Sequence, residues 1–206
     1  MDQNLKESKS LKYLLKQWFN KTIDYQNSFL KYYQSIQKKS QDEIVLYASE
    51  LQKYLGKVKT RQCEEFRKKI ILSISSLDFE IFELSEFLQS YKSHLDKPQE
   101  YKVNFPTLNR IKEHVRNNIE TVNSLNVLQN NLAKSANVIF VTGKRSKKRN
   151  EVMFEDFMKK HVNLLRRIIR ENNIFIEEFK QIITVLEKEI EIVVEKAEPK
   201  VAATTH

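Results

Sequence analysis

Glycine and proline are nearly absent from this sequence, which holds two glycines and three prolines in 206 residues. These residues supply the tight turns that sandwiches, barrels and α/β sheets need at short intervals. Their scarcity excludes folds with many turns and favours a few very long helices. It also argues against an enzyme, because glycine-rich phosphate loops and strained catalytic turns depend on the same residues.

Cysteine and long apolar runs are scarce as well. The single cysteine, Cys63, cannot form an internal disulfide, which fits a reducing compartment. Apolar runs, such as Val138 to Val141, do not exceed five residues and are far too short to cross a membrane. The polar residues 1–10 lack the apolar core of a secretory signal. We therefore expect an intracellular protein, either cytoplasmic or associated with the cytoskeleton or a membrane surface.

Charge is plentiful and unevenly distributed. The net charge is +9, and residues 144–170 hold ten bases against three acids, whereas residues 171–206 hold four bases against eight acids. A dense basic segment attracts phosphate or anionic lipid. The same segment can equally pair with acids of its own bundle or of a protein partner.

Apolar residues follow alternating steps of three and four along most of the chain, which is the pattern of a helix with one buried face. The fold class we predict is all-α: an elongated single-domain bundle of about four long helices, residues 1–198, with coiled-coil-like heptad packing. The tail is expected to be flexible. The predicted helices span about 5–38, 41–96, 106–137 and 150–196, and the predicted tail spans 199–206.

Three details of this prediction depend on local signals. The second helix is expected to begin near Ser40 and to end at Pro98, with a bend between Val58 and Ile70, where the heptad steps falter. Unbroken, it would be roughly 80 Å long. Residues 137–143 and 190–194 are rich in β-branched side chains, and their pattern fits either a helix or a strand. The basic run from Lys144 to Arg149 is predicted to be a loop.

The basic run resembles tracts that bind polyanions or direct nuclear import. Five further bases follow on the next predicted helix, opposite its apolar seam. A second basic cluster, residues 57–69, would join them if the register of the helices brought the two together. A solvated face explains both clusters equally well. The candidate polyanion-binding residues are Lys144, Arg145, Lys147, Lys148, Arg149, Lys159, Lys160, Arg166, Arg167 and Arg170.

No catalytic, metal or cofactor site is predicted. A Gly-Lys pair at residues 143–144 lacks the earlier glycine of a phosphate-binding loop, since Val138 stands there. His161 and Asn172 lie on the seam of the fourth helix, where polar residues usually set register and partner choice. Four acids form an acidic face without the Glu-x-x-His pattern of a bundle di-iron site. They are Asp78, Glu80, Glu83 and Glu86.

These patterns favour a non-enzymatic helical scaffold or adaptor subunit of a larger assembly, with no small-molecule substrate. The broad apolar faces indicate protein partners or self-association through the helix seams. The alternative is a peripheral binder of anionic membrane or nucleic acid through residues 57–69 and 144–170. In architecture alone, long bent helices with basic clusters are similar to BAR-type membrane-curving dimers. Of these two ligands nucleic acid is the less favoured, because the sequence contains no recognisable nucleic-acid-binding module.

Overall fold

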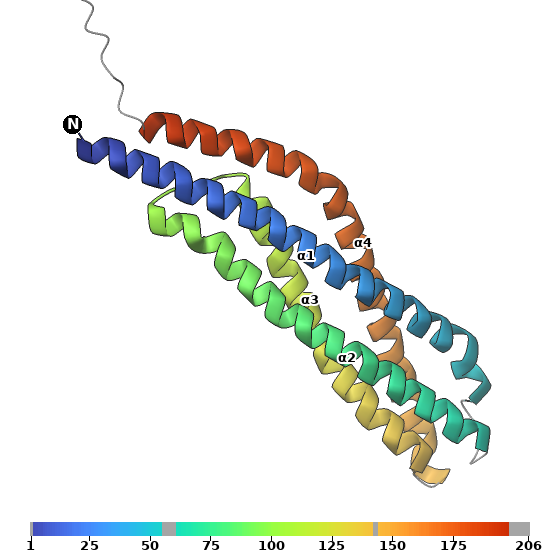
Figure 1. Ribbon diagram of the computed structural model, residues 1–206. Helices are drawn as coiled ribbons and strands as arrows, with labels where there is room; N and C mark the ends of the chain where they lie inside the picture. Colours follow the sequence, from blue (N-terminus) through green and yellow to red (C-terminus); the bar gives the residue numbers. More distant parts are fainter. Residues whose placement is uncertain (1, 55–60, 142–143, 198–206) are drawn as a thin grey trace, which may run out of the picture.

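The computed structural model describes residues 2–54, 61–141 and 144–197, which fold into an elongated bundle of four α-helices without strands (Figure 1). Side-chain positions are described for residues 11–41, 75–134 and 156–197 and for a few outside these ranges. The all-α prediction is confirmed, whereas the heptad character of the packing stays a prediction. The helices are α1 (Asp2–Tyr54), α2 (Arg61–Asp96), α3 (Leu108–Val141) and α4 (Lys144–Ala197), with a short 3-10 helix, η1 (Lys97–Tyr101), after α2.

Successive helices run antiparallel, and each packs against two neighbours (Figure 1). In the described residues α1 contacts α2 and α4, and α3 also contacts α2 and α4, whereas α2 and α4 do not contact each other. Helices α2 and α4 therefore run parallel at opposite corners of the bundle. Their outward faces point in different directions. Exposed side chains of α2 and of α4 therefore belong to separate surfaces.

The core is a continuous column of side chains from the seam of each helix. On α2 the buried residues recur at three- and four-residue steps, as the sequence predicts. Burying one such aliphatic side chain stabilises the fold by about 1.5–3 kcal/mol. Aromatic residues from α1, α2 and the connection between η1 and α3 fill the end of the column beside η1, where Trp18 stacks on Phe105. The buried seam of α2 consists of Leu77, Ile81, Leu84, Leu88, Tyr91 and Leu95.

The predicted boundary between the first two helices is wrong. Helix α1 continues through Ser40 to Tyr54, and α2 begins only at Arg61, so no single helix spans residues 41–96. Ser40 is not an N-cap but a fully buried seam residue. Neighbouring polar side chains stay outside the core, and Lys39 pairs with Glu80 of α2 at 2.6 Å. Residues 55–60 and the bend predicted at Val58 lie outside the described residues.

The basic run that we predicted to be a loop is helical. Helix α3 extends to Val141 and α4 begins at Lys144, so residues 137–141 are helix and Lys144–Arg149 form the first turns of α4. Nothing in this run breaks a helix, since lysine and arginine have high helix propensity. Residues 190–194 are helical as well. Residues 142–143 and the tail from residue 198 lie outside the described residues.

The connection between α2 and α3 agrees with its proline signals. Helix α2 ends at Asp96, two residues before Pro98, as predicted. Lys102 then adopts a left-handed backbone with φ of 57°, and its backbone N–H donates to the carbonyl oxygens of Gln99 and Pro98. Ordinary residues adopt this conformation at a small cost, which a capping hydrogen bond offsets. The connection brings Phe105 into the core, where it is 1% exposed.

Candidate functional site

All the predicted polyanion-binding residues lie on α4. They fall into two groups along the helix. The side chains of the first group, which lies in the first turns of α4, are outside the described residues; this group is Lys144, Arg145, Lys147, Lys148 and Arg149. The second group is exposed to solvent along about three turns of the same helix. It consists of Lys159, Lys160, Arg166, Arg167 and Arg170.

Two members of the second group are engaged along their own helix. Lys160 lies 2.7 Å from Asp156, and Arg167 lies 2.7 Å from Glu171, both one turn away. Exposed pairs of this kind contribute little to stability. Arg166 and Arg170 also lie one turn apart, and neither makes an ion pair with any described residue. Their guanidinium groups therefore remain available for an external anion.

The described members of the two basic clusters lie on different corners of the bundle. Lys57 and Lys59 lie outside the described residues, and Lys68 and Lys69 are exposed on α2. Because α2 and α4 occupy opposite corners of the bundle, the described members of the two clusters face different directions.

Sequence reasoning missed an exposed apolar stripe on α2. Leu72, Phe79 and Phe82 are 69%, 61% and 62% exposed, although their side chains are large and apolar. They lie on the side of α2 opposite its buried seam and share one broad helix face. Phenylalanines that fall off a seam are the signal that could have revealed this stripe. Contiguous apolar surface on a soluble protein usually marks an interaction site.

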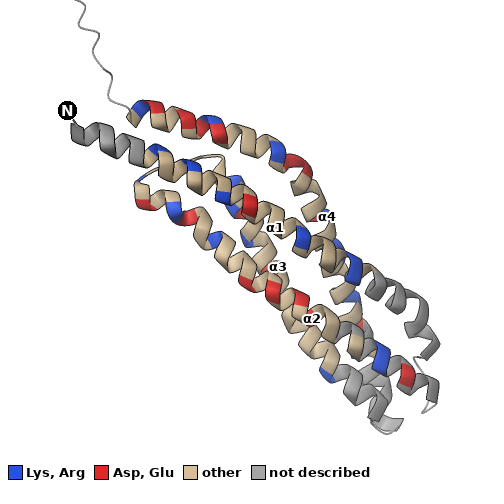
Figure 2. Ribbon diagram, in the orientation of Figure 1, with Lys and Arg blue, Asp and Glu red and all other residues tan. Residues whose placement is uncertain are grey.

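Acidic residues border the stripe. Residues 70–91 of α2 contain four acids and no lysine or arginine, and Figure 2 shows the acids gathered in the middle of the helix. Glu80 pairs with Lys39, whereas Glu83 and Glu86 make no ion pair with any described residue. Burial against neighbouring side chains raises the pKa of Asp78. We define the α2 face as Leu72, Asp78, Phe79, Phe82, Glu83 and Glu86.

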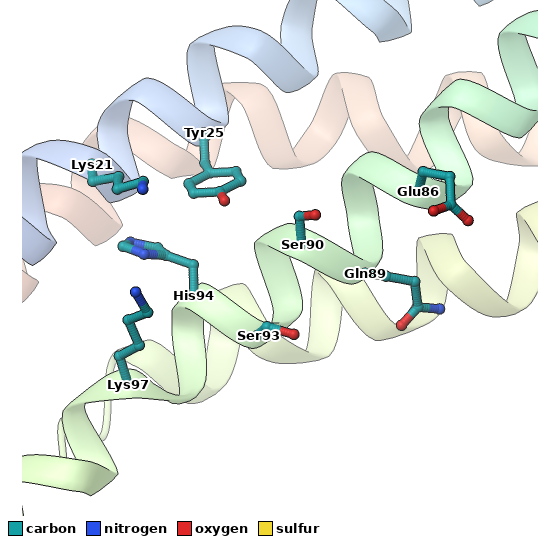
Figure 3. A pocket seen from close by; sticks show the side chains of 8 residues that line it. All are labelled: Lys21, Tyr25, Glu86, Gln89, Ser90, Ser93, His94 and Lys97. Atoms are coloured by element: carbon teal, nitrogen blue, oxygen red, sulfur yellow. The ribbon is translucent and has the colours of Figure 1, made fainter.

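A groove of about 380 Å³ opens between α1 and α2 near η1 (Figure 3). The side chains of Lys21 and Lys97 reach toward the ring of His94 from two sides. Neither lysine makes an ion pair with any described residue. Serine and glutamine side chains of α2 line the rest, together with Tyr25 and Glu86. The groove concentrates positive charge at one end only.

His94 is a structural residue of the core. Its Nε2 lies 3.0 Å from Oγ1 of Thr22 and 3.2 Å from the carbonyl oxygen of Trp18, and the indole N–H of Trp18 donates to its carbonyl oxygen at 2.9 Å. Its ring stacks on Tyr25 and on Trp18. Burial, together with the charges of Lys97 and Lys21, lowers the pKa of His94 to about 4, against the opposing effect of its hydrogen bond with the carbonyl oxygen of Trp18. The neutral imidazole thus connects α2 to α1 through these hydrogen-bonding and stacking contacts.

The described residues hold no group of three or more histidine, cysteine, aspartate or glutamate side chains that could bind a metal ion. No helix within those residues is long and apolar enough to span a membrane. Comparisons of the chain with protein-family models, with curated proteins and with solved structures give no match. The candidate functional surfaces are therefore the α2 face and the basic stretch of α4.

Proposed function

We propose that this protein is a non-enzymatic helical scaffold or adaptor, which holds another protein against its α2 face. The observation that carries the proposal is the solvent exposure of Phe79 and Phe82 on one side of a helix whose other side is fully packed. Burying an aromatic or leucine side chain at an interface contributes about 1.5–3 kcal/mol. The three apolar residues of the stripe are the anchors of the proposed interface.

The acids that border the stripe define the chemistry of that partner. A helix that combines apolar anchors with lysine or arginine would fill the stripe and pair with Glu83 and Glu86. Its own amphipathic pattern would repeat at three- and four-residue steps, as in helix-in-groove recognition. We therefore expect a basic amphipathic helix as the binding element.

Site-specific photo-crosslinking tests this proposal. A photoreactive phenylalanine analogue placed at Phe79 in the full-length protein, in its native cell, should yield a discrete crosslinked protein species. The matched control is the same analogue at Val127 of α3, which is 61% exposed but lies outside the α2 face. Crosslinks from Phe79 alone support the proposal. Equal crosslinking from the two positions, or none from Phe79, contradicts it.

A second candidate function, binding to an anionic membrane or to nucleic acid, is favoured by the exposed and unpaired side chains of Arg166 and Arg170. Phosphate contacts weaken steeply as salt rises. Co-sedimentation with phosphatidylserine vesicles and with an oligonucleotide, across a salt series, tests it. Replacing Arg166 and Arg170 with glutamine should abolish such binding. A parallel variant replaces the five bases of residues 144–149 with glutamine, which separates the two basic groups.

We further propose that the protein acts inside the cell. The support is the single cysteine in a chain of 206 residues, which suits a reducing compartment. A thiol-labelling assay in intact cells checks this point, since Cys63 should be found reduced.

A further inference from the structure

The bundle carries opposite charge on two of its corners. Residues 70–91 of α2 contain four acids and no base, whereas residues 157–170 of α4 contain five bases and no acid. The α2 run contains the exposed Phe79 and Phe82. On α4 the exposed apolar residues flank the run, since Val152 and Ile174, 61% and 54% exposed, lie on either side of it, beyond Asp156 and Glu171. At 100° per residue, Val152 and Ile174 share one side of α4 with Lys159, Arg166 and Arg170. We define the α4 face as Val152, Lys159, Arg166, Arg170 and Ile174.

The α2 face and the α4 face lie at the same level along the bundle axis, as the contacts of both helices with α1 show. Tyr33 of α1 donates a hydrogen bond to the carbonyl oxygen of Ile169 on α4 at 2.8 Å. Lys39, about 9 Å further along α1, contacts Glu80 on α2 at 2.6 Å. Since α4 is antiparallel to α1, Glu80 lies level with about residue 163 of α4. Residues 78–86 of α2 thus stand level with about residues 161–169 of α4.

The two helices also run in the same direction. Both are antiparallel to α1, and they lie at opposite corners of the bundle. A simple sideways shift of one molecule by about the width of the bundle would therefore bring the α4 face of one copy against the α2 face of the next. In that position Arg166 and Arg170 stand opposite the acids of the partner without any shift along the axis.

We propose that the partner of the α2 face is a second copy of this chain, which binds through its α4 face. This inference rests on the function proposed above and names its partner. Charge complementarity selects this pair of faces, because an α2 face meeting another α2 face, or an α4 face meeting another α4 face, would place like charges together. In this position Val152 stands level with about residue 69 of the partner's α2 and Ile174 with about residue 91, so the apolar residues of the α4 face lie at the two ends of the contact and the charges lie between them.

The contact is heterologous, since it joins two different surfaces. After one copy has bound, its own α2 face and the α4 face of its neighbour remain open. Copies therefore add side by side into an open-ended row rather than stopping at a dimer. A protein that extends in this way can array whatever else it binds at regular intervals.

The experiment uses two variants of the full-length protein, each with one face disabled. Phe79→Lys combined with Phe82→Lys disables the α2 face, and Arg166→Gln combined with Arg170→Gln disables the α4 face, so that the two disabled faces do not carry opposite introduced charges. All four side chains are exposed, so circular dichroism and thermal melting should match those of the wild type. Wild-type protein should form a ladder of species that grows with concentration and shrinks at high salt. Each variant alone should be monomeric.

The mixture of the two variants is decisive. Each variant keeps the face that the other has lost, so one contact forms and nothing can add to it. Sedimentation velocity should therefore show a heterodimer and no larger species. Each disabled face should weaken self-association by at least about tenfold. As a matched control, Val127→Lys combined with Arg116→Glu changes exposed residues of α3 and should leave the ladder intact.

Two results would overturn the proposal. One is a wild-type protein that stays monomeric at low salt, and the other is a mixture that forms no heterodimer. Photo-crosslinking from Phe79 distinguishes the failures. Crosslinks to a different protein without self-association would reject the second copy and retain the scaffold, whereas the absence of any crosslink would reject both. Binding of the α4 face to vesicles or an oligonucleotide, with no heterodimer in the mixture, would assign that face to a polyanion.

Discussion

Asn172 of α4 donates a hydrogen bond from its Nδ2 to Oδ1 of Asn118 of α3, at 2.9 Å, inside the core. The two side chains are 1% and 3% exposed. Asn118 in turn donates to the carbonyl oxygen of His114 at 2.9 Å. Because a buried amide without a partner is costly, this contact favours one register of α4 against α3 over slipped alternatives.

The first prediction concerns this pair. Asn172→Ala leaves Oδ1 of Asn118 buried without its donor, so the free energy of unfolding should fall by about 1–3 kcal/mol. Replacing both asparagines with leucine should restore much of that loss, because no orphaned amide remains. Urea denaturation measures both effects. The exposed Asn163 of α4 is the control, and Asn163→Ala should change stability by less than about 0.5 kcal/mol.

The buried seam of α2 and the place of Asn172 on the buried seam of α4 could be predicted from the sequence, whereas the first helix boundary could not. Periodicity identified the buried face of α2 because one helix alone determines which of its residues share a side. Ser40 and the acids that follow it look like the start of a helix. In the structure, however, the small serine side chain fits in the buried seam, and no residue there breaks the helix. Local capping signals therefore predicted a boundary that the long-range packing of α1 overrides.

The α2 face illustrates a second limit. In the sequence Phe79 and Phe82 fall outside the seam of α2, but whether another helix covers that side depends on the bundle, in which α2 packs between α1 and α3 and leaves both side chains exposed. That arrangement is a property of the whole bundle. The separation between the described members of the two basic clusters has the same cause, because only the helix order places α2 and α4 at opposite corners.

The second prediction concerns a cap supplied by another helix. Glu189 of α4 accepts hydrogen bonds from the backbone N–H of Thr107 at 3.3 Å and from its Oγ1 at 2.6 Å, just before α3 begins. A carboxylate at a helix N-terminus satisfies free N–H groups and opposes the helix dipole. Glu189→Ala should therefore cost about 1 kcal/mol. It should also speed amide hydrogen exchange in the first turn of α3.

The control for this cap lies two residues away on α4. Glu191 is exposed and carries the same charge, so Glu191→Ala should leave both stability and exchange in α3 unchanged. A similar effect from both variants would mean that the total charge near the end of α4, rather than the cap, governs the start of α3.

The third prediction concerns the single tryptophan. Trp18 is 4% exposed, stacks on His94 and Phe105, and donates its indole N–H to the carbonyl oxygen of His94. Trp18→Phe keeps an aromatic ring but removes the donor and part of the volume. The free energy of unfolding should fall by about 1–3 kcal/mol. Thermal melting followed by circular dichroism measures it, and Tyr13→Phe at a position 62% exposed should have almost no effect.

The last prediction concerns pH. Burial lowers the pKa of three core histidines well below the ordinary value of 6.5: to about 4 for His94, about 3 for His114 and about 4 for His161. Between pH 6.5 and about 4 the unfolded chain therefore binds protons that the folded chain does not. The folded state must lose stability as the pH falls through this window, and the histidines should have no effect above it.

The size of the effect follows from the number of histidines. Each contributes up to about 1.4 kcal/mol per pH unit, so the three together should give a slope of about 4 kcal/mol per unit near pH 5. Urea denaturation at a series of pH values measures this slope. His161→Leu places an apolar residue on the same seam and should reduce the slope by about one third. An unchanged slope in this variant would show that His161 takes up its proton in the folded state as readily as in the unfolded chain.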